Sequence, residues 1–147
     1  SPYKILDKIT DNLLKTFTKY QDDISDIEEK LYANNTDNNF LNHWLELKLD
    51  ILRIERILHK ASNAIDEFID FHEDKDDFPI NNYTDLHEHL ERTMRSSALQ
   101  LSKLDYLYSF YNAKSNDKMN KMTEDNPLLA MMQSAFANDN ESVKNAK

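Results

Sequence analysis

The chain of 147 residues contains no glycine and no cysteine. Without glycine it cannot build the phosphate-binding loops of P-loop or dinucleotide-binding proteins, because those loops bring the backbone close to the ligand. Without cysteine it has no disulfide, no thiolate metal site and no cysteine nucleophile, and its compartment stays open. These two absences exclude nucleotide chemistry by either of those routes.

Long apolar runs and an excess of basic charge are also missing. The longest apolar stretches, such as Pro127-Leu-Leu-Ala-Met-Met132, are far shorter than the roughly 18 residues that a membrane span requires. Lys and Arg number 18 against 27 Asp and Glu, giving a net charge of −9. We therefore expect no membrane span in this chain, no binding to nucleic acid, and no attraction to an anionic membrane surface.

The chain contains 39% hydrophobic and 31% charged residues, a composition that is typical of long amphipathic helices. Apolar residues recur at alternating steps of three and four from Leu6 to Leu31, from Leu41 to Phe68, and from Tyr83 to Tyr111. This spacing predicts three long helices, and the third could continue to Met122. Trp44 is predicted to anchor the packing of the first two helices.

The predicted fold is all-α, an antiparallel bundle of three long helices in which the third is overlong and stalk-like. A repeat near 3.5 residues favours supercoiled, nearly parallel axes, and the short connections favour antiparallel neighbours. At 1.5 Å per residue the first two helices span roughly 45–50 Å and the third roughly 60 Å. We therefore expect the third helix to extend beyond the hairpin.

The pattern changes after residue 123, so we predict one domain over 1–123 and a separate segment over 124–147. Asn126-Pro127 is a cap followed by proline at the first helical position. A short amphipathic helix over 127–137 is expected, followed by a polar tail. The apolar residues predicted to share one face of this helix are Leu128, Leu129, Met132 and Phe136.

The densest cluster of chemically active residues is Asp85-Leu-His-Glu-His-Leu-Glu91. Asp85 and His89 lie four residues apart, so they share a helix face and could contact a divalent cation such as Mg²⁺ or Co²⁺. An alternative is a solvated first turn, in which acidic residues offset the helix dipole and Glu91 pairs with Arg95. Both interpretations remain open.

Other chemistry finds less support in the sequence. No Glu-x-x-His motif of a di-metal bundle is present, and no nucleophile with an acid–base partner stands out. We therefore expect no enzyme activity and no organic cofactor. The acidic groups at 22–29 and 66–77 predict a negative surface that attracts cations weakly.

Four motifs in order resemble the helical region of CorA-type magnesium and cobalt channels. They are Ser1-Pro-Tyr-Lys-Ile-Leu-Asp-Lys-Ile-Thr-Asp11, Leu45-Glu-Leu-Lys-Leu-Asp-Ile-Leu-Arg53, Tyr83-Thr-Asp-Leu-His-Glu-His89 and Ser115-Asn-Asp-Lys-Met-Asn-Lys-Met-Thr123. The resemblance covers roughly residues 1–123. The family's transmembrane Gly-Met-Asn signature and the α/β domain that precedes the helices have no counterpart in this sequence.

The resemblance implies a hairpin packed on a stalk, with five stalks around a central ion path. It implies that Asp85 contributes to regulatory divalent binding between subunits, with Glu88 and His89 as further possible contacts. It also implies that Asn120 lies at the cytoplasmic pore mouth, whereas Ser109 replaces a second acidic stalk residue.

The leading hypothesis is the soluble cytoplasmic helical region of a CorA-like Mg²⁺/Co²⁺ transporter. Its expected role is ion sensing and subunit association, with weakly bound divalent cations and other copies of the chain as partners. The sequence starts at Ser1 without an initiator methionine, which is compatible with a piece of a longer protein, and a complete protein stays open as well. The alternative is a stand-alone helical protein-interaction module, derived from that fold and without transport activity.

Overall fold

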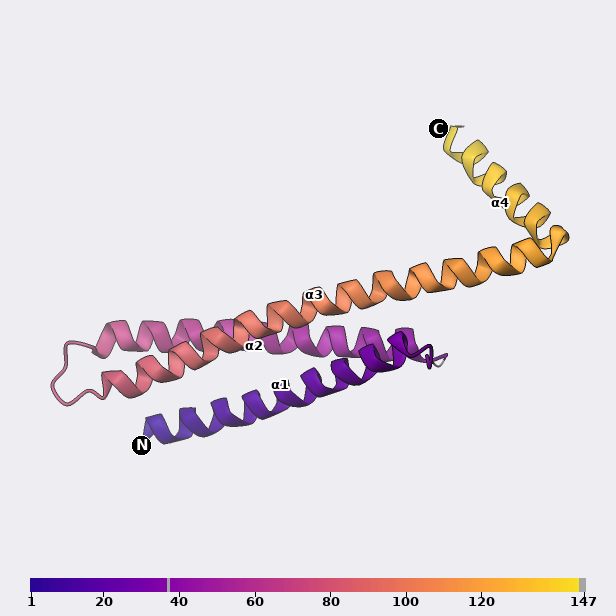
Figure 1. The fold of residues 1–147 in the computed structure, drawn as a ribbon. Helices are drawn as coiled ribbons and strands as arrows, with labels where there is room; N and C mark the ends of the chain where they lie inside the picture. The colour runs from indigo at the N-terminus through magenta and orange to yellow at the C-terminus, as the bar shows by residue number, and fades with distance from the viewer. Residues whose placement is uncertain (37, 146–147) are drawn as a thin grey trace. The chain divides into compact units, whose positions relative to one another are not determined.

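The computed structural model describes residues 1–36 and 38–145, which form four α-helices and contain no strand (Figure 1). The helices are α1 (Pro2–Tyr32), α2 (Phe40–His72), α3 (Ile80–Asp125) and α4 (Pro127–Asn145). The predicted all-α class is confirmed. The chain divides into two compact units, Ser1–Tyr108 and Ser109–Lys147.

The first unit is an up-down-up arrangement of α1, α2 and the first part of α3 (Figure 1). Contacts between α2 and α3 fix their opposite directions. Trp44, early in α2, donates from Nε1 to the Leu104 carbonyl oxygen at 2.7 Å. Phe68, late in α2, meets Tyr83 near the start of α3 with ring centroids 5.1 Å apart. The predicted antiparallel packing of neighbouring helices is therefore present in this unit.

Helices α1 and α3 run in the same direction. Tyr3 contacts Tyr83 edge to face with centroids 5.5 Å apart, and Glu28 Oε1 accepts from Lys103 Nζ at 3.0 Å. Lys48, the one polar residue in the apolar pattern of α2, pairs with Asp105 of α3 at 3.1 Å. These ion pairs join the helices along the rim of the core.

The core consists of the residues that recur every three or four positions, as the periodicity predicts. Each of the three long helices turns one such stripe inward, so the first unit encloses a single continuous seam. The buried large apolar residues are Phe17, Ile24, Ile27 and Leu31 of α1, Phe40, Trp44, Leu47, Ile51, Ile54, Leu58 and Ile65 of α2, and Tyr83, Leu86, Leu90, Leu104 and Leu107 of α3.

The sequence predicts that Trp44 anchors the packing of the first two helices. In the structure, the contacts of its side chain lie on α3. Its indole donates to the carbonyl of Leu104, and its ring packs on Tyr108 at 4.8 Å, so these contacts join α2 to α3. The reason is the indole N–H, which needs an acceptor when buried and finds one on the α3 backbone.

Both connections turn without glycine by using residues that tolerate left-handed backbone conformations. Asn34 has φ 57° and Asp77 has φ 64°. At the end of α1, the Asn35 amide donates to the Lys30 carbonyl and the Asn34 amide donates to the Leu31 carbonyl. These two bonds form a Schellman motif, with asparagine at the position that glycine usually takes.

Helix α3 is 46 residues long, compared with 31 for α1 and 33 for α2. It is one continuous helix past the predicted end at Met122. Among the described residues after Leu107, none is buried. The boundary between the two units thus lies inside α3, at the position where the core ends.

Helix α4 begins where predicted and ends later than predicted. Asn126 Oδ1 accepts from the Leu128 amide at 3.2 Å and caps the helix, with Pro127 at the first helical position. The helix then continues to Asn145, whereas the sequence predicted its end at residue 137. Residues 138–145 contain no proline or glycine that would stop it, and the last two residues of the predicted tail lie outside the described ones.

Core burial makes the first prediction. Replacing the fully buried Leu90 by alanine should lower the free energy of unfolding by about 2–5 kcal/mol, because the change leaves a cavity. Leu99 on the same helix is 69% exposed, so Leu99→Ala should change it by less than about 0.5 kcal/mol. Urea unfolding followed by circular dichroism measures both, and equal effects would contradict the assigned core.

Candidate functional site

Asp85 and His89, the predicted ion contacts, lie in the first turns of α3 on the flank next to α1. The core side of this segment is taken by Tyr83, Leu86 and Leu90, which are all buried. Asp85 and His89 are exposed, and their four-residue spacing places them one turn apart on the same flank. The helix register therefore brings this predicted pair onto one surface.

Acidic residues of α1 approach the same flank. The pKa of the Tyr3 hydroxyl is raised first by partial burial, then by the negative charges of Asp7, Asp85 and Asp11. Asp7 and Asp11 are four apart on α1 and share a face, as Asp85 and His89 do on α3. Because charges act on one another over short distances in water, Asp7, Asp11 and Asp85 all lie within electrostatic range of Tyr3.

An open groove joins the two helices one turn further along. It has a volume of about 340 Å³ and is lined by Asp11, Leu14, Lys15, Thr18 and His89. Asp11 and His89 thus face the same space from different helices. Lys15 stands four residues after Asp11 and offsets part of its charge.

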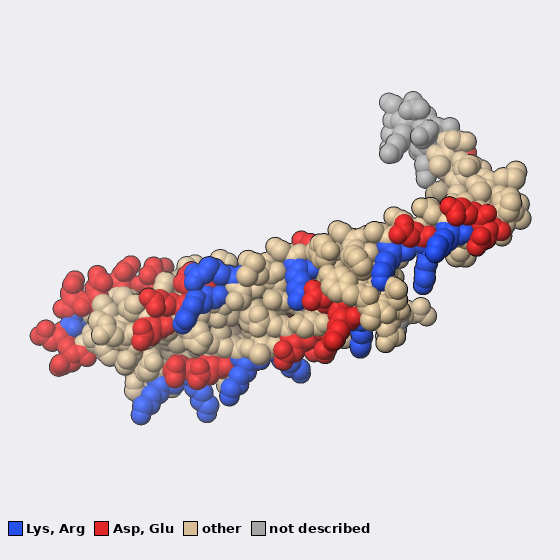
Figure 2. All heavy atoms as spheres, viewed as in Figure 1, with Lys and Arg blue, Asp and Glu red and all other residues tan. Residues whose placement is uncertain are grey.

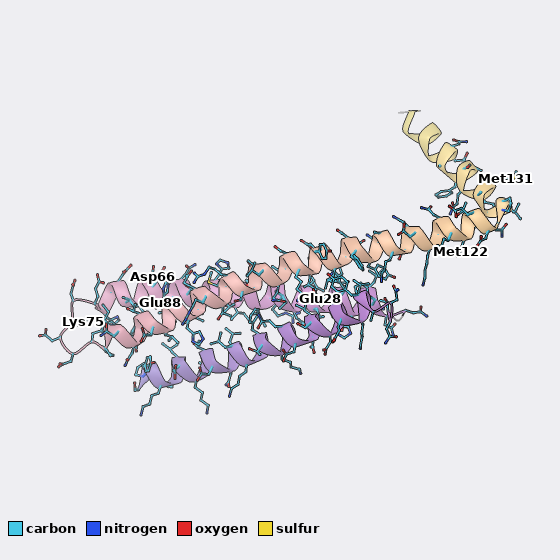
Figure 3. The ribbon with its side chains drawn as sticks, in the orientation of Figure 1. Glu28, Asp66, Lys75, Glu88, Met122 and Met131 are labelled. Atoms are coloured by element: carbon cyan, nitrogen blue, oxygen red, sulfur yellow. The ribbon has the colours of Figure 1, made fainter. Side chains whose placement is uncertain are left out.

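The other predicted site residues lie elsewhere. Glu88 is exposed and does not line the groove (Figure 3), and Asn120 is exposed on α3 in the second unit. Within the described part of the chain, no group of three or more histidine, aspartate and glutamate side chains is placed to hold a metal ion. Divalent binding at Asp85 and His89 therefore stays a prediction.

Carboxylates also gather at the end of the first unit where α2 connects to α3 (Figure 2). The exposed acidic residues there are Asp66, Glu67, Asp70, Glu73, Asp74, Asp76 and Asp77. These residues form the 66–77 part of the predicted negative surface, and Asp22, Asp26 and Glu29 of the 22–29 part are exposed on α1. Lys75 is the basic residue in this stretch, with its ammonium 4.8 Å from the ring centre of Phe71.

A partly buried polar cluster that the sequence did not predict joins α2 to α3. Ser62 Oγ donates to Glu91 Oε1 at 2.6 Å and lies 3.1 Å from His87 Nε2. His87 Nε2 is itself 3.6 Å from Glu91 Oε1. The sequence signal was present, because Ser62 lies next to the apolar stripe of α2 and the other two residues belong to the 85–91 cluster.

This serine, histidine and glutamate set is not arranged as a nucleophile with its base. Only 2% of Ser62 is exposed, so a substrate cannot reach its hydroxyl. The hydroxyl donates to Glu91, so His87 Nε2 can bond to Ser62 Oγ only when this nitrogen carries a proton. Glu91 therefore accepts a hydrogen bond from Ser62 of α2. The sequence suggested instead that Glu91 forms a surface ion pair with Arg95.

The comparison with protein families decides the relationship. The family described as CorA-like Mg²⁺ transporter protein matches residues 2–125, which include α1, α2 and the whole of α3. The chain belongs to this family. No curated protein and no solved structure matches the chain.

Membership in the CorA-like family confirms the resemblance that the four motifs suggested, and it relates the chain to transporters of divalent cations. The match ends at α3, so α4 lies outside it. Within the part of the chain that the structure describes, no helix has an apolar stretch that would cross a bilayer.

The polar cluster makes the second prediction. Ser62→Ala removes the hydroxyl that joins Glu91 and His87 and should lower the free energy of unfolding by about 0.5–1.5 kcal/mol, the net contribution of a hydrogen bond, because both partners remain partly accessible to water. Ser102 is exposed on α3, and Ser102→Ala should have almost no effect. Thermal unfolding measures the difference, and a neutral Ser62→Ala would show that the cluster contributes nothing to the α2–α3 contact.

Proposed function

We propose that the chain is the cytoplasmic helical region of a CorA-like divalent-cation transporter, in which it senses Mg²⁺ or Co²⁺ and contributes to subunit association. The observation that supports this proposal is the groove between α1 and α3, which Asp11 and His89 line from different helices, with Asp7 and Asp85 within electrostatic range of the neighbouring Tyr3. It occurs inside the segment that matches the family. In this proposal the cation interacts with Asp85 and His89, and Glu88 contributes a neighbouring charge.

In this proposal the chain senses cations through the repulsion between its acidic residues. All of the net negative charge lies in the first unit, since residues 1–108 contain 22 acidic and 13 basic residues. In this proposal Asp85 of α3 repels Asp7 and Asp11 of α1 when no cation is present, and a divalent cation between the helices would reverse that interaction. A change in cation concentration would thus change how tightly the start of α1 is held against α3.

The same argument applies between copies of the chain. A subunit carrying a charge of −9 repels an identical neighbour, and divalent cations shared between the two would relieve that repulsion. In this proposal Asp85 has the bridging role that the family resemblance implies. Asn120, which is exposed on α3, would face the ion path at the pore mouth.

Divalent binding gives the third prediction. Mg²⁺ or Co²⁺ should raise the unfolding temperature, because a ligand that binds only the folded form stabilises it, by about 1.4 kcal/mol at ten times the Kd. The rise should amount to a few degrees, and Asp85→Asn should reduce it. The measurement is thermal unfolding by circular dichroism over a millimolar range of metal at constant ionic strength.

Asp22→Asn is the matched control, because it removes the same charge from an exposed position on α1 and should keep the full shift. Two results would contradict the proposal. One is the absence of any shift at millimolar metal. The other is an equal shift in the two variants, which would indicate general screening of the acidic surface.

The alternative function, a helical interaction module, is favoured by a different observation. Helix α4 lies outside the family match and exposes large apolar side chains, with Phe136 70% exposed and Met131 69% exposed. Such side chains on a helix are typical of a surface that binds another protein.

A further inference from the structure

The outward face of α2 carries a continuous strip of exposed residues that the divalent site does not use. We call it the α2 strip, and its members are Leu41, Leu45, Leu49, Leu52, Arg56 and Lys60. At 3.6 residues per turn these side chains lie within a sector of roughly 100°. The buried residues of the same segment, such as Ile51 and Leu58, lie on the opposite side of the helix. The α2 strip therefore points away from the core.

The first half of the α2 strip is apolar. Its four leucines are 38–50% exposed. Single exposed leucines are ordinary on a protein surface, but these four follow one another at steps of four, four and three and form one stripe. This is the spacing with which a helix packs against a neighbour. Helix α2 thus has two apolar stripes, one in the core and one without a partner in the first unit.

The second half of the α2 strip is basic, because Arg56 and Lys60 continue it by one turn each. The neighbouring charged residues lie beside partners within the chain, which are Lys48 with Asp105, Arg53 with Asp50 and His59 with Glu55. Among the residues that the structure describes, Arg56 and Lys60 take part in no ion pair. Two positive charges therefore remain available on a unit whose net charge is −9.

The two halves together define the chemistry of a partner. The leucines require apolar side chains at helical spacing, and Arg56 and Lys60 require carboxylates. A helix that is acidic in its first turns and apolar on one face thereafter supplies both. We propose that the α2 strip binds such an acidic amphipathic helix of another protein.

The partner helix lies antiparallel to α2 in this proposal. Its acidic first turns then meet Arg56 and Lys60, and its later turns cover the four leucines. Carboxylates are favoured in the first turn of a helix, and antiparallel helices place opposite dipole ends side by side. From residue 41 to residue 60 the strip is roughly 30 Å long, which is the length of a helix of about 20 residues.

The area of the α2 strip is sufficient for a specific contact. Lys48 and Arg53 border the strip, so eight side chains of α2 are within reach of the partner. At roughly 60–120 Å² per side chain they contribute roughly 480–960 Å², compared with roughly 800 Å² per partner in a standard interface. We therefore expect a complex at the weaker end of specific protein interactions.

An anionic membrane also attracts leucine with arginine and lysine, but it matches this surface less well. The acidic stretch 66–77 begins six residues after Lys60, which is roughly 9 Å along the helix. A flat anionic surface that contacts the α2 strip would approach those carboxylates to about one Debye length, and they would repel it. A single helix about 10 Å wide contacts the strip alone. The charge pattern therefore favours a helix over a lipid surface.

A synthetic helical peptide gives the fourth prediction. The probe has about 20 residues, with glutamates in its first two turns and leucines at steps of three and four thereafter. Fluorescence anisotropy of the labelled peptide with the full chain and a metal chelator should give a micromolar Kd. Leu45→Glu should weaken binding by about tenfold or more, because it places a charge in the apolar half. Leu99→Glu makes the same change at an exposed position of α3 and should alter the Kd by less than about threefold.

No binding at about 1 mM peptide, or equal weakening in the two variants, would overturn the proposal. Because the chelator removes divalent cations and the α2 strip contains neither Asp85 nor His89, this result is independent of the proposed ion sensing.

Charge reversal gives the fifth prediction. Arg56→Glu should weaken binding of the same peptide by about tenfold, because an attraction to its glutamates becomes a repulsion. Arg92→Glu, at an exposed position of α3, is the matched control and should change the Kd by less than about threefold. Circular dichroism should show that both variants keep the helical fold. Equal Kd values for the two variants would overturn the assigned basic half.

Two further measurements distinguish the other possible occupants of the α2 strip. They are flotation of the chain with phosphatidylcholine and phosphatidylglycerol vesicles, and sedimentation equilibrium of the chain without peptide. The proposal expects that Leu45→Glu leaves both results unchanged. Vesicle binding that Leu45→Glu abolishes would assign the strip to lipid, and self-association that Leu45→Glu abolishes would assign it to a second copy. Either result would overturn the proposal.

Discussion

The burial of one aliphatic stripe on each of three helices is the constraint on which the structure depends. Ile24, Ile51 and Leu90 are completely buried, and they represent stripes from α1, α2 and α3 that meet in one seam. Because a helix presents about a third of its surface to such a seam, the register of the seam also decides which side chains stand on the flanks. His89 lines a groove with residues of α1, and Ser62 reaches His87, as consequences of that register.

The sequence predicts the fold correctly wherever apolar residues recur regularly at steps of three and four. The three long helices, their antiparallel order and the continuity of α3 all follow from steps of three and four. Two local features were harder to predict. Trp44 joins α3 because its indole N–H needs a buried acceptor, and no periodic pattern specifies which backbone carbonyl supplies it. Helix α4 continues past residue 137 because a polar stretch without glycine or proline gives no clear stop.

The candidate site was predictable only in part, for a physical reason. Spacing along one helix placed Asp85 and His89 together, but it carries no information about the neighbouring helix. The approach of Asp7 and Asp11 depends on the parallel packing of α1 on α3, which short-range patterns do not encode. The same limit concealed the Ser62 cluster, because its three members come from two helices and only their tertiary contact makes them a set.

Charge and apolar surface are divided between the two units of the chain. The first unit combines a net charge of −9 with a buried seam, so its surface attracts cations. The second unit is neutral and keeps large apolar residues such as Phe136 exposed. Because exposed charges interact with ions only over short distances in water, a change in cation concentration should affect the first unit and have little effect on the second.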